Sequence, residues 1–163
     1  MDMPDGTACF IDANILCYHF IESPRFSPLS SDCLQRVAAG AIAGYGAVQV
    51  IAEASHKIML AEAAATFGLN RPALVNWLQR HSKRITELRQ FRQAAKDFPE
   101  MGLSILPADT MIIPEAARLS TEWGLLTNDA LILPLMQRHG LTHLVTNDDD
   151  FDAVPNLTIW KPR

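Results

Sequence analysis

Several features of other protein classes are absent from this chain of 163 residues. No run of apolar residues approaches the roughly 18 needed to span a bilayer, and Asp2 and Asp5 occupy positions where a secretory signal peptide carries basic residues. Low-complexity segments are also lacking, and a composition of 48% apolar and 20% charged residues is typical of globular proteins. We therefore expect a cytoplasmic globular protein with no membrane partner.

Cysteine is scarce and is not arranged for metal binding. Cys9, Cys17 and Cys33 are odd in number, form no C-x-x-C pair and lie within or beside apolar runs. They are expected to be small buried thiols in a reducing compartment. The five histidines share no metal-ligand spacing with the cysteines, which argues against a zinc site.

Basic residues are not in excess, since the formal net charge is −4. Their distribution is uneven, however. Between residues 71 and 96 lie seven of the fourteen basic residues against a single acid, Glu87; the seven are Arg71, Arg80, Lys83, Arg84, Arg89, Arg92 and Lys96. This segment is either a solvated helical face or a basic arm that binds a polyanion.

Short apolar runs alternate with longer amphipathic stretches, which is the pattern of an α/β fold. Strands are expected at residues 7–11, 47–51, 104–106, 143–146 and 157–160. Helices are expected at residues 13–20, 30–43, 52–66, 70 to about 96, 110–123 and 129–139, with Gly44 and Gly46 ending the second helix and Asn128 capping the last. Strands separated by helices predict a mainly parallel sheet with helices on both faces, and the length suits one domain over residues 1–163.

Four acidic residues directly follow apolar runs: Asp12, Glu53, Asp129 and Asp148. Any one of them could simply cap a helix or lie on the surface. The sequence Thr-Asn-Asp nevertheless occurs at two of the four positions, residues 127–129 and 146–148. In parallel sheets the ligand crevice lies at the carboxyl ends of the strands. Four like charges there repel one another unless a cation compensates them, and carboxylates select hard cations, so we expect Mg²⁺ or Mn²⁺.

The segments around these acids resemble the PIN-domain nucleases, and their order and spacing resemble those of VapC-type toxins. The resemblance covers residues 7–160 and rests on residues 10–16, 50–53, 128–132 and 139–151, of which the closing Thr-Asn-Asp-x-Asp-Phe is the most specific. It implies a PIN-like three-layer α/β/α sandwich with a mainly parallel sheet. It also implies catalytic, metal-binding roles for Asp12, Glu53, Asp129 and Asp148, a fifth metal ligand in Asp150, and polar neighbours of the site in Asn14 and Thr146.

The function implied by this resemblance is metal-dependent hydrolysis of RNA phosphodiester bonds by the toxin of a type II toxin-antitoxin pair. A cognate antitoxin and a second copy of the chain, in a homodimer, are the implied partners. RNA would be held by basic residues of the middle segment: Arg80, Lys83, Arg84, Arg89 and Arg92. Two features depart from the family pattern, namely Pro134 inside the helix that begins at Asp129 and a long helical middle segment at about residues 70–98.

Three alternatives are weighed against this interpretation. A phosphatase of the haloacid dehalogenase kind also has an aspartate after its first strand, but it requires a second aspartate where this chain has Asn14. A nuclease of RNA maturation or DNA flaps would share every metal ligand. A non-cleaving PIN-like module that binds RNA or protein would be expected to lose some of the four acids, all of which are present.

Overall fold

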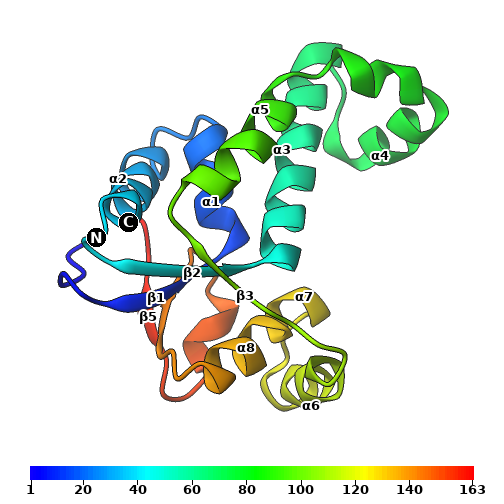
Figure 1. Ribbon diagram of the computed structural model, residues 1–163. Helices are drawn as coiled ribbons and strands as arrows, with labels where there is room; N and C mark the ends of the chain where they lie inside the picture. Colours follow the sequence, from blue (N-terminus) through cyan, green and yellow to red (C-terminus); the bar gives the residue numbers. More distant parts are fainter.

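The computed structural model describes residues 1–163, apart from the side chain of Arg71, which belongs to the basic segment. Its strands are β1 (Ala8–Ile11), β2 (Ala43–Ala47), β3 (Ser104–Leu106), β4 (His143–Val145) and β5 (Thr158–Trp160). They form one sheet in the order β3-β2-β1-β4-β5, and all neighbouring strands are parallel (Figure 1). The expectation of a mainly parallel sheet is confirmed.

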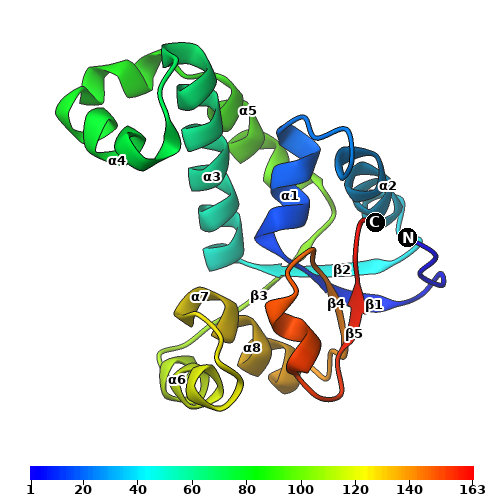
Figure 2. The ribbon, with the colours of Figure 1, turned by 180° about the vertical axis from the view of Figure 1, so that it is seen from behind.

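Helices cover both faces of this sheet, as Figures 1 and 2 show from opposite sides. One face carries α1 (Ala13–Phe20), α2 (Ser27–Ala38), α3 (Val48–Phe67) and α5 (Gln90–Asp97). The other face carries α6 (Ile112–Trp123), α7 (Thr127–Ala130) and α8 (Ile132–Arg138). Short 3-10 turns complete the chain at η2 (Phe98–Glu100) and η3 (Asp150–Ala153). The predicted three-layer α/β/α sandwich is therefore confirmed.

The long helix α3 extends past the sheet, and the middle segment packs against its far end (Figure 1). This segment contains α4 (Arg71–Arg80) and the 3-10 turns of η1 (Ser82–Glu87), and it returns to the sheet layer through α5. A small second hydrophobic cluster holds it to α3, with Ala63, Leu74, Leu78 and Leu88 at its centre. The predicted helical stretch thus forms three pieces rather than one.

The main core lies between the sheet and its two helical layers. Its largest fully buried side chains include Phe10 and Ile11 of β1 and Phe151 of η3. All three cysteines are buried, as expected from their apolar neighbours. None of the helices in the described part of the chain combines the length and the hydropathy needed to cross a membrane.

The sheet order places a switch point between β1 and β4. From β1 the chain proceeds outward on one side to β2 and β3, whereas β4 and β5 extend the sheet on the other side. At such a point two neighbouring crossovers leave in opposite directions, and a crevice opens at the carboxyl ends of the two strands. Asp12 directly follows β1, and Thr146 directly follows β4, so both residues lie at this crevice.

The predicted second strand was misplaced by four residues. Residues 48–51 form the first turn of α3, and β2 instead contains Gly44 and Gly46, which were expected to end a helix. The cause is close packing: a Cβ at Gly44 would lie 2.7 Å from both Cγ atoms of Val37 on α2. The strand therefore needs glycine at position 44, and glycine carries no strand signal. Glu53 consequently lies in the second turn of α3 rather than directly after a strand.

Two predicted helices also have different boundaries. The helix expected at residues 30–43 is α2, which begins three residues earlier with Pro28 in its first turn and ends at Ala38. The helix expected at residues 129–139 is divided into α7 and α8, and Asn128 lies inside α7 rather than capping it. Pro134 has no N–H to donate to the carbonyl of Ala130, which accounts for the break between the two pieces.

Candidate active site

Asp12 is the most buried acid of the chain, with 7% of its surface exposed. Its backbone N–H donates to the carbonyl of Val145 on β4, which ties the end of β1 to the neighbouring strand. Its side chain caps α1, because Oδ1 accepts a hydrogen bond from the N–H of Ala13 at 2.6 Å. Capping occupies only one of the two carboxylate oxygens.

The second oxygen of Asp12 belongs to a polar network with the two predicted neighbours. The hydroxyl of Thr146, which is fully buried, donates to Oδ2 at 2.7 Å, and the Asn14 amide donates to the same oxygen. Asn14 also donates to the Thr146 hydroxyl at 2.8 Å and accepts from the N–H of Asn147 at 3.1 Å. The N–H of Asp148 donates to Thr146 Oγ1 at 3.0 Å. The network therefore connects Asp12 to the loop after β4.

Three of the other predicted acids line one open cleft of about 480 Å³. Glu53 comes from α3, Asp129 from α7 and Asp148 from the loop after β4, and Lys57 and Asn128 also line it. Asp150 lies close by, since its N–H donates to Oδ1 of Asp148 at 3.0 Å. Acids that are far apart in the sequence thus meet at the carboxyl edge of the sheet.

The electrostatics of the cleft favour fewer negative charges than its acids carry. Burial, supported by the charges of Asp129 and Glu53, raises the pKa of Asp12 to about 6, although hydrogen bonds from Thr146 and Ala13 oppose the rise. Burial also raises the pKa of Asp129, and the nearby charges of Asp148 and Glu53 add to that effect. Burial, with a smaller contribution from the neighbouring carboxylates, therefore disfavours ionisation of Asp12 and Asp129.

Lys57 supplies positive charge inside this acidic group, although its sequence context alone did not mark it as a site residue. Its Nζ lies 2.6 Å from Oε1 of Glu53, one turn earlier on α3. Burial opposes the charged form of Lys57, but the hydrogen bond to Glu53 and the charges of Glu53 and Asp12 outweigh it and raise the lysine pKa. The available signal was the i,i+4 spacing of Glu53 and Lys57 on a predicted helix.

The donor set suits a hard divalent cation. Every acid at the cleft offers carboxylate oxygens, which are the ligands that Mg²⁺ and Mn²⁺ prefer. Among the residues that the structure describes, no three acidic, histidine or cysteine side chains already form a preassembled metal-ligand group. The oxygens of Asp12 and Glu53 are instead engaged by Thr146, Asn14 and Lys57.

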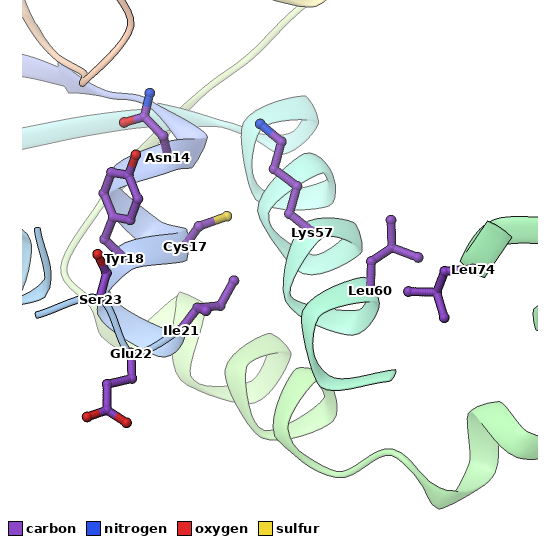
Figure 3. A pocket seen from close by; sticks show the side chains of 9 residues that line it. All are labelled: Asn14, Cys17, Tyr18, Ile21, Glu22, Ser23, Lys57, Leu60 and Leu74. Carbon is purple, nitrogen blue, oxygen red and sulfur yellow. The ribbon is translucent and has the colours of Figure 1, made fainter. Parts of the chain in front are cut away.

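A second cavity, of about 460 Å³, lies between α1 and α3, beside the acidic cleft (Figure 3). Ile21, Leu60 and Leu74 make one part of its wall apolar. Polar groups come from Asn14, Tyr18, Glu22, Ser23 and Lys57. Figure 3 shows that the Lys57 side chain extends along α3, with its ammonium group toward the end where Asn14 lies. Lys57 is common to the cavity and the acidic cleft.

Six basic residues of the middle segment have exposed side chains. Those predicted to bind RNA are all exposed: Arg80, Lys83, Arg84, Arg89 and Arg92. Arg89, Arg92 and Lys96 line a shallow depression on α5. Arg84 pairs with Glu87 at 3.0 Å, so part of this positive charge is already compensated.

Fold and site together define a class of protein: an α/β/α domain that gathers carboxylates at the switch point of a parallel sheet. A sequence model of the PIN domain matches residues 9–157. The chain therefore belongs to the PIN domain family, a family of nucleases, which confirms the resemblance seen in the sequence.

Similar solved structures agree with this fold. The VapBC2 structure from Rickettsia felis bound to a promoter DNA fragment has 18% identity and a TM-score of 0.58, covering 95% of this chain and 98% of that one. A toxin-antitoxin complex from Klebsiella pneumoniae gives the same four values: 18%, 0.58, 95% and 98%. PAE2754 from Pyrobaculum aerophilum has 16% identity and a TM-score of 0.53, covering 94% and 91%. At these identities the similarity shows the fold alone. No curated protein sequence matches the chain.

Proposed function

We propose that this protein is a ribonuclease that requires Mg²⁺ or Mn²⁺ and acts as the toxin of a toxin-antitoxin pair. The observation that carries the proposal is the buried carboxylate of Asp12 at the switch point, beside a cleft lined by Glu53, Asp129 and Asp148. Membership of a nuclease family supports phosphodiester hydrolysis. Two of the similar structures are toxin-antitoxin assemblies, which supports a toxin role and a cognate antitoxin as partner.

The metal would be held by the carboxylates of Asp12, Glu53, Asp129, Asp148 and Asp150. A bound divalent ion supplies an activated water and stabilises the charge that develops on the phosphate. The chain's own contribution is to position its ligands. Thr146 and Asn14 fix the carboxylate of Asp12, and the N–H of Asp150 orients that of Asp148.

RNA would be held by the exposed basic residues of the middle segment. Arg89 and Arg92 lie at α5 and form no ion pair within 4 Å among the described residues, although the charge of Arg92 helps to lower the pKa of Glu62. Their exposed guanidinium groups could therefore bind phosphate groups. Replacing both with alanine should weaken RNA binding and make it less dependent on salt. The slope of log K against log salt should become shallower by about 0.7 for each phosphate that the variant no longer binds. Unchanged affinity would assign these arginines to ordinary surface.

A homodimer and a cytoplasmic location complete the proposal. Three buried thiols agree with a reducing compartment. Size-exclusion chromatography with light scattering tests the oligomeric state directly. Induction of the gene with and without that of a neighbouring small protein tests the toxin role, because growth arrest that the second protein relieves is the expected result.

The decisive experiment is cleavage of a panel of structured and single-stranded RNA by the purified protein in Mn²⁺. EDTA and the variants Asp12→Asn and Asp148→Asn serve as controls, and each should abolish cutting while the circular dichroism spectrum is retained. A DNA flap and single-stranded DNA belong in the same panel. Cutting of DNA but not RNA would refute the ribonuclease assignment, and cutting that survives loss of either carboxylate would refute the site.

A further inference from the structure

Lys57 is the only basic side chain among the described residues that line the acidic cleft. It lies there through its place on α3, where positions four apart share one face of a helix. The ion pair with Glu53 gives it a clear role in the metal-free protein. That ion pair conflicts with the proposed metal-binding role of Glu53, because a metal ion and the ammonium group would compete for the same carboxylate.

Lys57 interacts with more of the cleft than Glu53 alone. Its charge lowers the pKa of Asp129, and the charge of Asp12 in turn raises the pKa of Lys57. The ammonium group therefore takes the position of a partial counter-ion for three acids. A divalent cation held by the same acids would place a second positive charge near the Lys57 ammonium group, and the two would repel each other.

The lysine side chain is free to move away from the metal ligands. It is 52% exposed, compared with 24% for Glu53, and its unbranched stem has four rotatable bonds. It also lies at the border between the cleft and the cavity beside α1 (Figure 3), so open space is available to it on both sides. In the proposed reaction the substrate brings a phosphate group to the cleft, and this negative group is a new partner for the ammonium group of Lys57.

We propose, building on the proposed nuclease function, that Lys57 is the phosphate-binding residue of the cleft. It pairs with Glu53 while the metal is absent, and on metal binding it releases that carboxylate and donates to a non-bridging oxygen of the phosphodiester. Removal of the lysine then has opposite effects on two ligands: the metal gains a carboxylate without a competitor, and the nucleic acid is deprived of a charged hydrogen-bond donor.

The test compares Lys57→Met with Lys57→Arg and with Arg118→Met in the full chain. Arg118 pairs with Glu122 four residues later on α6, so its replacement makes the same charge change at an i,i+4 pair that does not line the cleft. Calorimetric titration with Mn²⁺ alone measures metal affinity. Fluorescence anisotropy in Ca²⁺, with a gel to confirm that the probe stays intact, measures binding of a short single-stranded RNA and of DNA of the same sequence.

For Lys57→Met we expect Mn²⁺ to bind roughly threefold more tightly or better, because a competing cation is gone. RNA should bind about tenfold more weakly, as expected for the loss of one hydrogen bond between charged groups. Lys57→Arg should keep RNA binding near that of the wild type, and Arg118→Met should change neither affinity.

Other outcomes overturn the inference in distinguishable ways. If the wild-type protein binds RNA and Lys57→Met binds it equally well, Lys57 only stabilises α3. Weaker metal binding in Lys57→Met would make the lysine a support for Glu53 rather than its competitor. A wild-type protein that binds DNA but not RNA refutes the ribonuclease proposal alone, and a tenfold weaker binding of DNA by Lys57→Met would still support the phosphate-binding role.

Discussion

Replacement of Asp12 by asparagine should change how the stability of the metal-free protein depends on pH. Burial raises the pKa of this carboxyl from 3.8 to about 6 in the folded protein. At about 1.4 kcal/mol per pKa unit, ionisation of Asp12 lowers the free energy of unfolding by about 3 kcal/mol. Only a small part of the side chain is exposed, so solvent screens this effect little.

The sign follows from proton binding. Between pH 3.8 and about 6 the folded state holds the Asp12 proton more tightly than the unfolded state does, so the folded state binds more protons. The contribution of Asp12 to the free energy of unfolding therefore falls as pH rises through this window and stays low at pH 7. An asparagine does not titrate, and the variant loses this slope.

Hydrogen bonding adds a cost to the variant that does not depend on pH. Oδ2 of Asp12 accepts from both Thr146 and Asn14, and an amide group cannot serve all the donors around this side chain. An unmet buried donor costs about 1 to 3 kcal/mol. The free energy of unfolding of the variant at a single pH is therefore a poor readout. A better one is the difference between variant and wild type, followed from pH 4 to pH 7.

Urea unfolding in EDTA at pH 4, 5, 6 and 7 measures this change. Relative to the wild type, Asp12→Asn should gain about 2 kcal/mol between pH 4 and pH 7, because part of the titration lies below pH 4. Asp149→Asn is the control, because Lys161 and Arg163 lower the pKa of Asp149 and its titration therefore lies below pH 3.8. The stability difference between this variant and the wild type should stay nearly constant from pH 4 to pH 7. A stability difference between Asp12→Asn and the wild type that stays constant over this range would refute the reasoning.

Two further predictions concern packing and the loop after β4. Gly44→Ala should lower the free energy of unfolding by about 1 to 3 kcal/mol through overpacking against Val37. Gly46→Ala should cost far less in the same urea assay, because its Cβ would have its nearest neighbour at 3.6 Å. Equal losses would contradict the packing argument. Lys161→Met removes ion pairs to two acids of the loop after β4, and we expect the loop to be less ordered as a result. Mn²⁺ should then bind more weakly in a calorimetric titration, while the free energy of unfolding falls by less than about 1 kcal/mol. Unchanged metal affinity would show that these ion pairs do not help to order the loop.

The sequence predicted the elements whose signals are local. The helix after Asp12 and the strand at residues 104–106 have the predicted boundaries, because a cap and flanking breakers mark them. The strand β2 could not be found, since Gly44 is required by close packing with Val37 of α2, which is a long-range property. Close packing of a helix against a strand does not produce an alternating pattern of apolar and polar residues in the strand sequence.

The candidate site shows the same division. That Asp12 and Asp148 come close to one edge follows from their places after buried strands, which a parallel sheet brings together. That Thr146 and Asn14 hold the Asp12 carboxylate depends on side-chain geometry across 132 residues of sequence. The i,i+4 spacing from Glu53 was the one signal for Lys57, and it was not enough, because each member of such a pair resembles an ordinary surface residue until the cleft around it is known.

The acids after β4 show how the fold gives equivalent residues different tasks. Asp148, Asp149, Asp150 and Asp152 are alike in the sequence, yet Lys161 pairs with Asp149 and Asp152 at 2.6 and 2.7 Å. Asp148 instead accepts a hydrogen bond from the backbone N–H of Asp150 and faces the cleft. Positive charge is thus used in two ways around one site. Lys161 holds acids that do not line the cleft, whereas Lys57 holds one that the proposed metal ion would need, so our proposal requires only the second pairing to break.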